Sequence, residues 1–230
     1  MLILWDIDGT LLRAKRFREW PLHLEVARSF GIKLSSIPFS TEGLSDSDIM
    51  SQLFALSKNP RDIKALQESL TYLDLISQQS DSETVFEVFP GVVEMLDFFA
   101  VNDIDSGILT GNTYNRARSK IERSNLANFF NQDFIFTCNP GESRKDIANR
   151  AHNDLQHFGI DLALIIGDTP SDIHVARHIG YNVISVATGK FQLNELAIYE
   201  PDLLIENLNE SIQVVSTFIA SLNNSGPLTF

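Results

Sequence analysis

The sequence predicts an α/β protein in which a largely parallel sheet is sandwiched by helices and a helical subdomain is inserted after the first strand. Two observations predict this class. From Val85 onward, short apolar segments alternate with helical segments, which is typical of a parallel sheet with right-handed crossovers. Between residues 13 and 86, apolar residues recur at helical spacing instead. A stretch of roughly 70 residues is too long for a connection inside a compact domain, so we expect a separate subdomain.

The first strand is the apolar run at residues 2–5, and two carboxylates follow it. Asp6 and Asp8 stand at alternate positions, so an extended chain points both to the same side. Gly9 then allows a sharp turn and a close approach to a ligand. Two ionised carboxylates about 4 Å apart repel by about 4 kcal/mol at an effective dielectric of about 20. The pair therefore indicates a catalytic edge with a cation, a shared proton or divergent side chains; a plain strand with an Asp-Gly turn is the alternative.

The insert contains groups of apolar residues at helical spacing, with Gly31 and Pro38 between them. We expect a helical cap over residues 13–86 and a core over residues 1–12 and 87–230. The groups that predict the cap helices are Leu22, Val26 and Phe30, then Ile49, Leu53 and Leu56, then Ile63, Leu66, Leu70 and Leu73.

A run of cations follows the first motif directly, at Arg13, Lys15, Arg16 and Arg18. The run could steer an anionic substrate, which makes Arg13 a candidate substrate-binding residue. A solvated helix face is the alternative for most of these side chains, because charge runs usually form one.

After the insert, helices and strands alternate to the C-terminus. This order predicts a Rossmann-like sheet, whose ligands bind beyond the carboxyl ends of the strands. The tail from Asn223 is expected to fray. In order, the pattern predicts a helix opened by Pro90-Gly91 and running through Phe99, a strand at 106–110, a helix at 116–125, a strand at 133–138, a helix at 144–158, a strand at 162–166, a helix at 172–179, and strands at 183–187 and 203–205 before a closing helix.

Two of these junctions carry groups that suit a phosphate. Thr110 ends a strand, and Gly111-Asn112 leads into a helix N-terminus, where backbone N–H groups favour an anion and the hydroxyl adds a donor. An ordinary capping turn is the alternative. Arg144 and Lys145 open a later helix, although the helix dipole favours anions there. Cations at that place indicate pairing with carboxylates and a phosphate, and two solvated side chains are the alternative.

A third junction adds carboxylates. A strand ends at Asp168, and Asp172 follows at the start of a helix in which Pro170 suits the first turn. Asp168 would face the same crevice as the carboxylates of the first motif, and a helix-capping cluster is the alternative. Several carboxylates in one crevice form an oxygen-rich site for a hard divalent cation, Mg²⁺ by preference. The metal ligands that we expect are Asp6, Asp8, Asp168 and Asp172.

Composition limits the class of protein and its partners. The net charge of −12 argues against nucleic acid or an anionic membrane surface as a partner. No basic segment precedes the first apolar run, which carboxylates interrupt, so no signal peptide is expected. No uncharged stretch approaches the roughly 18 residues of a membrane span. The single cysteine, Cys138, cannot form an internal disulfide, so we expect a cytoplasmic protein. We also expect a monomer or small homo-oligomer.

Four motifs, in this order, closely resemble those of the haloacid dehalogenase superfamily, and the likeness covers the whole chain. The insert resembles the cap of phosphoglycolate-phosphatase-like and β-phosphoglucomutase-like members, which closes over the substrate and selects the leaving group. Residues 41–48 resemble the cap stretch that faces the active site, which makes Gly43 a candidate substrate contact; a helix N-cap before Ile49 is compatible with this. The four motifs are Asp6-Ile7-Asp8-Gly9-Thr10, Thr110, a basic residue near 145, and Gly167-Asp168 followed by Asp172.

The resemblance implies a Mg²⁺-dependent phosphatase for a small phosphorylated metabolite. It implies that Asp6 is the nucleophile, which forms an aspartyl-phosphate, and that Asp8 is the general acid and then the base. Thr110 and the basic residue would hold the phosphoryl group. Asp6, Asp8 through its backbone carbonyl, and Asp168 would bind Mg²⁺. Cleavage of a phosphate monoester needs an in-line nucleophile, neutralisation of charge and a proton for the leaving group, and these residues would supply them.

Alternatives remain at one residue and in the function. The superfamily usually has Lys-Pro at the third motif, where this chain has Arg144-Lys145; we favour Lys145 as the phosphate-stabilising cation, with Arg144 as the alternative. A phosphomutase of the same superfamily is an alternative function. A dehalogenase would not need Asp8. A signalling receiver domain gathers similar residues around Mg²⁺ but is shorter and has no such cap, and a complete set of motif residues argues against a non-catalytic binding protein.

Overall fold

The computed structural model describes residues 1–15, 21–57, 62–81 and 84–223. Of the cations that follow the first motif, Arg16 and Arg18 lie outside this part of the chain, as does the tail from residue 224. Within the described residues, no helix has both the length and the apolar character that a membrane crossing requires.

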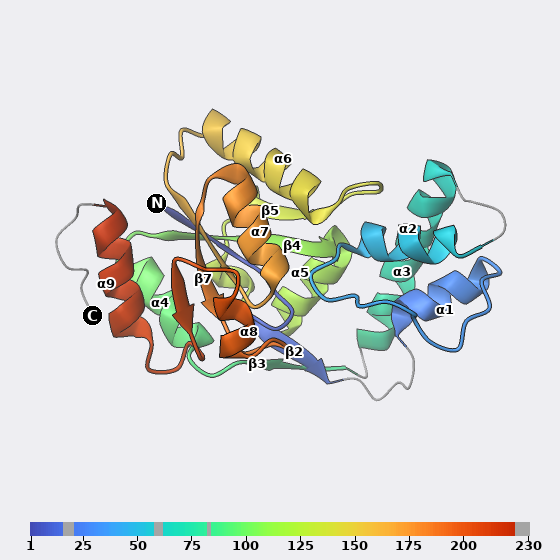
Figure 1. The fold of residues 1–230 in the computed structure, drawn as a ribbon, viewed down its shortest axis with the longest axis horizontal. Coiled ribbons are helices and arrows are strands. Elements are labelled where there is room, and N and C mark those ends of the chain that lie inside the picture. Colours follow the sequence, from blue (N-terminus) through green and yellow to red (C-terminus); the bar gives the residue numbers. More distant parts are fainter. Residues whose placement is uncertain (16–20, 58–61, 82–83, 224–230) are drawn as a thin grey trace.

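The described residues form a six-stranded parallel sheet with the order β5-β4-β1-β6-β7-β8 (Figure 1). The central strand β1 (Leu2–Trp5) is completely buried, as its unbroken apolar sequence predicts. It pairs on one side with β4 (Asp105–Thr113) and on the other with β6 (Ala163–Gly167). The remaining strands are β5 (Ile135–Cys138), β7 (Asn182–Val186) and β8 (Leu203–Ile205).

Helices cover both faces of the sheet, and alternate residues of β1 pack against different helices. Ile3 and Trp5 lie in one core with α4 (Val92–Val101), α5 (Tyr114–Arg123) and α9 (Ile212–Asn223). The other residues of β1 lie in a second core with α6, α7 and α8. The period of two along a strand accounts for this separation. The bounds of the second group are α6 (Arg144–His157), α7 (Pro170–Ile179) and α8 (Leu193–Ala197).

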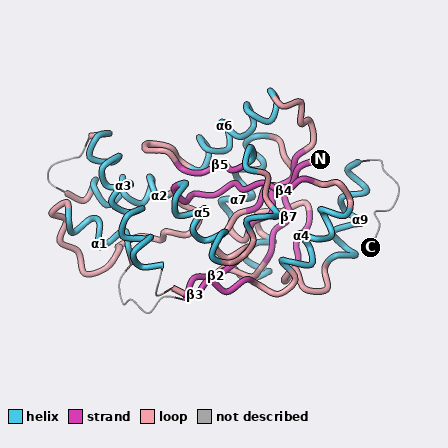
Figure 2. The backbone as a smooth tube through the Cα atoms, turned by 180° about the vertical axis from the view of Figure 1, so that it is seen from behind, coloured by secondary structure: helices cyan, strands magenta, loops and turns pink. Residues whose placement is uncertain are grey.

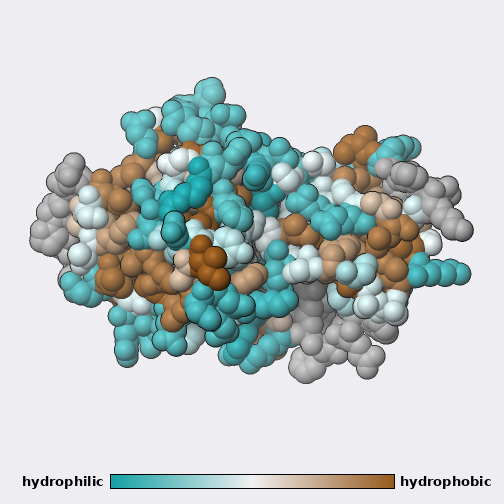
Figure 3. Space-filling model, in the orientation of Figure 1, coloured by the Kyte–Doolittle hydropathy of each residue, from teal (hydrophilic) through white to brown (hydrophobic). Residues whose placement is uncertain are grey.

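The insert is a helical lobe beside the sheet (Figures 1 and 2). Its helices are α1 (Leu22–Ser29), α2 (Asp46–Ala55) and α3 (Ile63–Asp81), and their apolar faces form a separate core. Because this core shares no residue with the two cores of the sheet, the cap packs as a unit. On the face shown in Figure 3, hydrophilic residues cover much of the middle of the molecule and hydrophobic ones gather mainly toward its two ends.

The cap joins the core through an antiparallel ribbon that the helical pattern did not indicate. Strand β2 (Leu12–Lys15) pairs with β3 (Val85–Val88). The domain boundaries that we expect, between residues 12 and 13 and between residues 86 and 87, both fall inside this ribbon. The strands are four residues long and partly exposed, too short to give a clear alternation in the sequence.

Two further boundaries differ from the sequence expectation near the site. Strand β4 continues to Thr113 instead of ending at Thr110, with an irregular register against β5 after Leu109. Helix α5 (Tyr114–Arg123) has Thr113 as its N-cap, so it begins two residues before the helix that we expect at 116–125. Helix α7 begins at Pro170, because the fixed φ of proline suits the first turn.

Candidate active site

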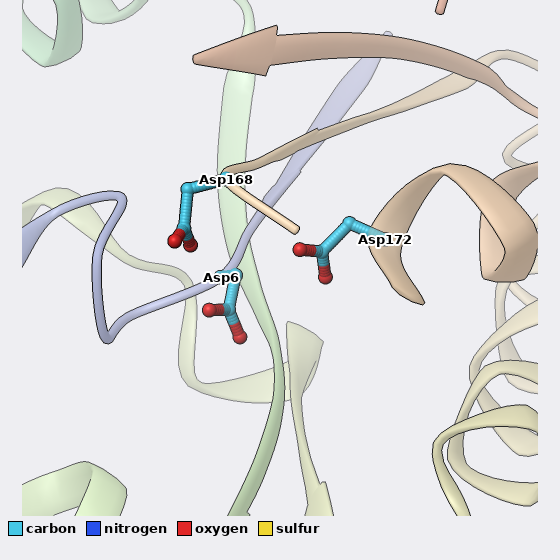
Figure 4. Close-up of side chains that lie close together, drawn as sticks. All are labelled: Asp6, Asp168 and Asp172. Carbon is cyan, nitrogen blue, oxygen red and sulfur yellow. The ribbon is translucent and has the colours of Figure 1, made fainter. Parts of the chain in front are cut away.

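The candidate site lies at the carboxyl ends of β1, β4 and β6, as expected for an open parallel sheet. Asp6 follows β1, Asp168 follows β6, and Asp172 lies in the first turn of α7. All three are buried, and one oxygen of each lies within 4.8 Å of the others. Figure 4 shows the three side chains close together where the first strand, β6 and α7 meet. The structure thus brings together three of the four carboxylates that we expect to bind a metal.

Neighbouring residues fix the orientation of this acidic cluster. The Thr10 hydroxyl donates to Oδ1 of Asp168 at 3.0 Å. The backbone N–H and the hydroxyl of Thr169 both donate to Oδ2 of Asp172, at 3.1 and 2.7 Å. Gly9 has a φ of +91°, and a Cβ there would lie 2.2 Å from an Asp168 oxygen. The glycine of the first motif is thus required both for its backbone conformation and for the space it leaves to Asp168.

The acidic cluster carries more negative charge than its surroundings neutralise. Burial raises the pKa of Asp6 to about 7, although Arg144 opposes the rise, and Asp172 and Asp8 add to it. Burial, together with the charge of Asp6, also raises the pKa of Asp168 well above its usual value. These are the shifts expected when carboxylates crowd together in a desolvated crevice. A hard divalent cation, which prefers oxygen ligands, fits this donor set and its charge.

We expect Mg²⁺ to stabilise the protein more at pH 8 than at pH 5. A raised pKa means that the folded state holds its proton more tightly than the unfolded state. The stability linked to Asp6 is therefore complete below the reference pKa of 3.8 and is lost as the pH rises through about 7. Bound Mg²⁺ replaces those protons, so the gain in melting temperature over a chelated sample grows across this range. Thermal unfolding with Mg²⁺ and with excess chelator measures it; an equal gain at both pH values, or an undiminished gain in Asp168→Asn, contradicts the expectation.

Arg144, and not Lys145, reaches the site. Its Nη1 donates to Oδ1 of Asp6 at 3.0 Å, and its Nη2 contacts Oδ1 of Asp172. Arg144 is buried, whereas Lys145 is exposed. The preference for Lys145 is therefore wrong. Ser143 caps α6 through a capping box with Asp146, which sets the rotation of the helix so that its first residue faces the sheet and the next faces solvent.

This assignment predicts different results for the two neighbouring cations. Arg144→Met should lower the turnover of a phosphate ester by about 10²-fold, since a buried donor beside Asp6, the candidate nucleophile, is lost. Lys145→Met should leave turnover essentially unchanged. Phosphate release by both variants at saturating Mg²⁺, with thermal unfolding as the check on folding, makes the comparison. An equal loss of turnover in the two variants would contradict the assignment of Arg144 as the cation at this site.

The residues after Leu109 continue strand β4, and one of them, Asn112, contacts Asp8. The Asn112 side chain donates to Oδ2 of Asp8 at 2.9 Å and to the Thr110 hydroxyl at 3.1 Å. Gly111 is where the cap approaches the core, because a Cβ there would lie 2.7 Å from the carbonyl oxygen of Leu44. Thr110, Gly111 and Asn112 all line the cavity that contains Asp6.

Asp8 points away from the acidic cluster, toward a lysine that the sequence did not single out. Lys120, in the second turn of α5, contacts Oδ2 of Asp8 and Oδ1 of Asn112. Lys120 is buried, whereas Asp8 is about half exposed. Desolvation would raise the pKa of Asp8, but Lys120 and Asn112 outweigh it, and the pKa lies below its usual value. The Asp8 carboxylate is therefore not part of the oxygen cluster suited to a metal.

The cap supplies the opposite wall of the site through Asp46, at the start of α2. Oδ1 of Asp46 contacts Arg116 of the core and lies 2.8 Å from Nε2 of His23, and Oδ2 accepts from the backbone N–H of Thr113 at 2.8 Å. All three contacts are buried or nearly so. Desolvation of Asp46 is outweighed by Arg116 and His23, which hold its pKa far below the usual value.

Two cavities adjoin at this junction. The smaller, of about 180 Å³, is lined by the nucleophile candidate Asp6, by Arg144 and by cap residues that include Gly43. The larger, of about 500 Å³, is lined by Lys120, Asp168 and Arg13. Asp8 lies on the wall of both. The two predicted substrate contacts therefore line different cavities. Gly43 lines the smaller cavity, around Asp6. Arg13 lines the larger cavity, where it is exposed and pairs with Glu87 at 2.6 Å.

Arg116 and Lys120 carry a signal in the sequence that could have located them. They share one face of α5 with Ala117 and Ile121, and all four are buried. Cations at positions i and i+4 on an apolar face are expected to have buried partners. Because surface cations are common on helices and neither residue belongs to a motif, the motifs alone do not identify these two residues.

The fold and this site define a capped α/β protein that gathers carboxylates and cations at the edge of a parallel sheet. The chain belongs to the haloacid dehalogenase-like hydrolase family, whose sequence model matches residues 3–186. The family and the hydrolase class that the motifs indicate are thereby confirmed.

Individual relatives are distant. The chain is 23% identical to a probable phosphatase, IndB, of Dickeya dadantii over 220 residues, which cover 92% of this chain and 91% of that one. It is 23% identical to a phosphoglycolate phosphatase of Synechococcus elongatus over 141 residues, which cover 60% and 64%. Among solved structures, a putative β-phosphoglucomutase from Bacteroides vulgatus superposes with a TM-score of 0.69 at 17% identity, over 96% and 89% of the two chains. A haloacid dehalogenase-like hydrolase from Streptococcus pneumoniae gives 0.61 at 21% identity, over 94% and 97%. The structural likenesses bear on the fold alone.

Proposed function

We propose that this protein is a Mg²⁺-dependent phosphatase that hydrolyses a small phosphate monoester through an aspartyl-phosphate on Asp6. The observation that carries the proposal is the position of Asp6. It ends the central strand, lies 3.0 Å from Nη1 of Arg144, belongs to the acidic cluster and lines the smaller cavity. A nucleophile, a fixed cation and carboxylates suited to a metal thus surround one point, which is the arrangement that phosphoryl transfer needs.

The reaction has two halves. In the first, an oxygen of Asp6 attacks phosphorus, the bond from phosphorus to the leaving oxygen breaks, and Asp8 gives that oxygen a proton. In the second, water attacks phosphorus, Asp8 takes a proton from it, and the bond between Asp6 and phosphorus breaks. The lowered pKa of Asp8 favours its carboxylate form, so it suits only the second of these roles, in which Asp8 takes a proton. Arg144 and the Thr110 hydroxyl would neutralise the phosphoryl oxygens. When bound by Asp6 and Asp168, Mg²⁺ would add positive charge there.

The cavities bear on the size of the substrate. The space around Asp6 has a volume of about 180 Å³, below the roughly 300–1,000 Å³ of sites for drug-sized ligands. This supports a small phosphorylated metabolite as substrate. The single buried thiol of Cys138 supports a reducing, cytoplasmic location.

A panel of phosphorylated metabolites tests the proposal. Phosphate release should depend on Mg²⁺ and stop in excess chelator, and in water enriched in oxygen-18 the released phosphate should acquire solvent oxygen. A phosphomutase, the second candidate, would return the phosphoryl group to another hydroxyl and release little phosphate. A panel on which no ester is cleaved, or full turnover in excess chelator, would refute the phosphatase.

A further inference from the structure

Lys120 is a buried cation beside the active site for which the proposed reaction has no role. Its side chain is 3% exposed, and its Nζ contacts Oδ2 of Asp8 and Oδ1 of Asn112. Burying an ammonium group is unfavourable unless its partners compensate for the lost hydration. A solvated position on α5 would avoid this cost, as Arg118 does two residues earlier. The contact with Asp8 is therefore the feature to explain.

The contacts hold one oxygen of Asp8 and leave the other uncommitted. Oδ2 accepts from Lys120 and, at 2.9 Å, from the Asn112 side chain. Asn112 is itself fixed by the Thr110 hydroxyl at 3.1 Å. In the described part of the chain no hydrogen bond is recorded to Oδ1, and the Asp8 side chain is 45% exposed to the two cavities. A carboxylate held at one oxygen by two donors has a defined direction for the other.

We propose that Lys120 is a positioning residue for proton transfer, which holds Oδ2 of Asp8 so that Oδ1 faces the leaving oxygen of the ester. The inference rests on the proposed phosphatase activity and adds a residue to it. As the bond from phosphorus to the leaving oxygen breaks, the electron pair remains on that oxygen and the proton on Oδ1 of Asp8 makes it an alcohol. In the second half-reaction the proton of the attacking water returns to Asp8, so Lys120 keeps its own protons throughout.

A role for Lys120 as a phosphate ligand fits the geometry less well. The cation on Asp6 is Arg144, which lines the smaller cavity. Lys120 lines the larger cavity and is not among the residues that line the smaller one. Its place is therefore beside the group that exchanges protons and away from the group that attacks phosphorus.

Lys120→Met, assayed on a series of phosphate esters, tests the proposal. Esters of aliphatic alcohols need a proton on the leaving oxygen, whereas nitrophenyl esters need little because the phenolate is stable. A positioned acid typically contributes about 10²–10⁴-fold. We expect kcat/KM of Lys120→Met to fall by about 10²-fold on alkyl esters and by only a few-fold on the nitrophenyl ester, the same gradient as in Asp8→Asn. Inhibition by inorganic phosphate should be unchanged.

Controls separate the outcomes. Arg118→Met removes an exposed cation from the same helix and should match the wild type on every ester, and Lys120→Gln provides a second substitution in case the first does not fold. A uniform loss on all esters, a weaker inhibition by phosphate, or no loss at all overturns the positioning role alone. A wild-type protein that cleaves none of the esters overturns the proposed function, and the role of Lys120 with it.

Discussion

Asp6→Asn should abolish turnover while leaving the metal-free protein at least as stable as the wild type. An amide is a poor nucleophile, and loss of a catalytic nucleophile costs about 10⁶-fold in well-studied hydrolases. Stability should not fall, because the pKa of Asp6 is raised by burial to about 7, which shows that its charge is disfavoured in the folded state. The neutral amide removes that penalty, and Arg144 retains Asp172 as a partner. Phosphate release at saturating Mg²⁺ measures the first effect, and thermal unfolding in excess chelator measures the second.

Asp8→Asn is the matched comparison. It should still form a phosphoprotein from an activated ester, since a good leaving group needs little protonation, whereas Asp6→Asn should form none. Mass spectrometry of the intact protein detects the added phosphoryl group. Turnover by Asp6→Asn near the wild-type rate, or a phosphoryl group found on it, would assign the nucleophile to another residue.

The position of Asp6 also explains how far the sequence could predict the site. A fully apolar run followed by Asp6 and Asp8 defines the central strand and its edge, because a strand buried on both faces is a nearly continuous run of apolar residues. The same reasoning applies to Ile165 and Ile166 of β6 and to Asp168, which follows that strand. The order of strands then places these ends together, since parallel strands present their carboxyl ends at one edge. The motifs at the strand ends can be recognised locally in the sequence, and the parallel topology then brings them together in space.

The sequence could not decide which neighbouring cation faces the site. Arg144 and Lys145 differ by 100° around α6, and the rotation of the helix depends on the capping box of Ser143 and on the packing of Ile147 and Ala148 against the sheet. Ile147 and Ala148 stand three and four positions after Arg144, on the same helix face. A count from those apolar residues would have favoured Arg144. The superfamily pattern, in which lysine is usual, directed attention to Lys145 instead.

Contacts between residues far apart in the chain were harder still to predict from the sequence. Lys120 meets Asp8 across more than a hundred residues, and Arg116 meets Asp46 of the cap. Neither pair has a fixed spacing along the chain, because each depends on how α5 packs against β4 and the cap. Such pairs are visible in a sequence only as cations that occupy an apolar helix face, which marks them as buried without naming their partners.

The contact of Asp46 with the core gives the expected motion of the cap a physical basis. Cap and core also meet where the Ser45 hydroxyl donates to the carbonyl of Glu142 at 2.7 Å and where Thr113 and Asn115 donate to Asp74. These contacts are polar, whereas the apolar core of the cap is separate. A junction made of polar groups can open without exposing a hydrophobic core, because water replaces the hydrogen bonds that are lost. We therefore propose that residues 13–86 open and close as a unit.

Asp46→Ala should open the cap. Removing one partner of a buried ion pair costs about 3–5 kcal/mol, because the other charge is left buried and unpaired. Arg116, His23 and the N–H of Thr113 would all lose their acceptor, and movement of the cap away from the core returns them to water. Hydrogen exchange in α2 and at Thr113 should then accelerate by about 10²-fold or more, at about tenfold per 1.4 kcal/mol, while the amides of β1 stay protected.

The double variant Asp46→Ala/Arg116→Met decides whether the ion pair is responsible. Without the cation no charge is left unpaired, so exchange in α2 should return toward the wild-type rate, and the two single substitutions should be strongly non-additive. Asp48→Ala, which removes only the carboxylate that accepts from the Ser45 N–H at the same helix terminus, is the matched control and should cost about 1 kcal/mol or less without opening the cap. Small-angle scattering of the single variant should show a more extended molecule. If exchange in β1 rises as much as exchange in α2, the chain unfolds globally and the cap does not move as a unit.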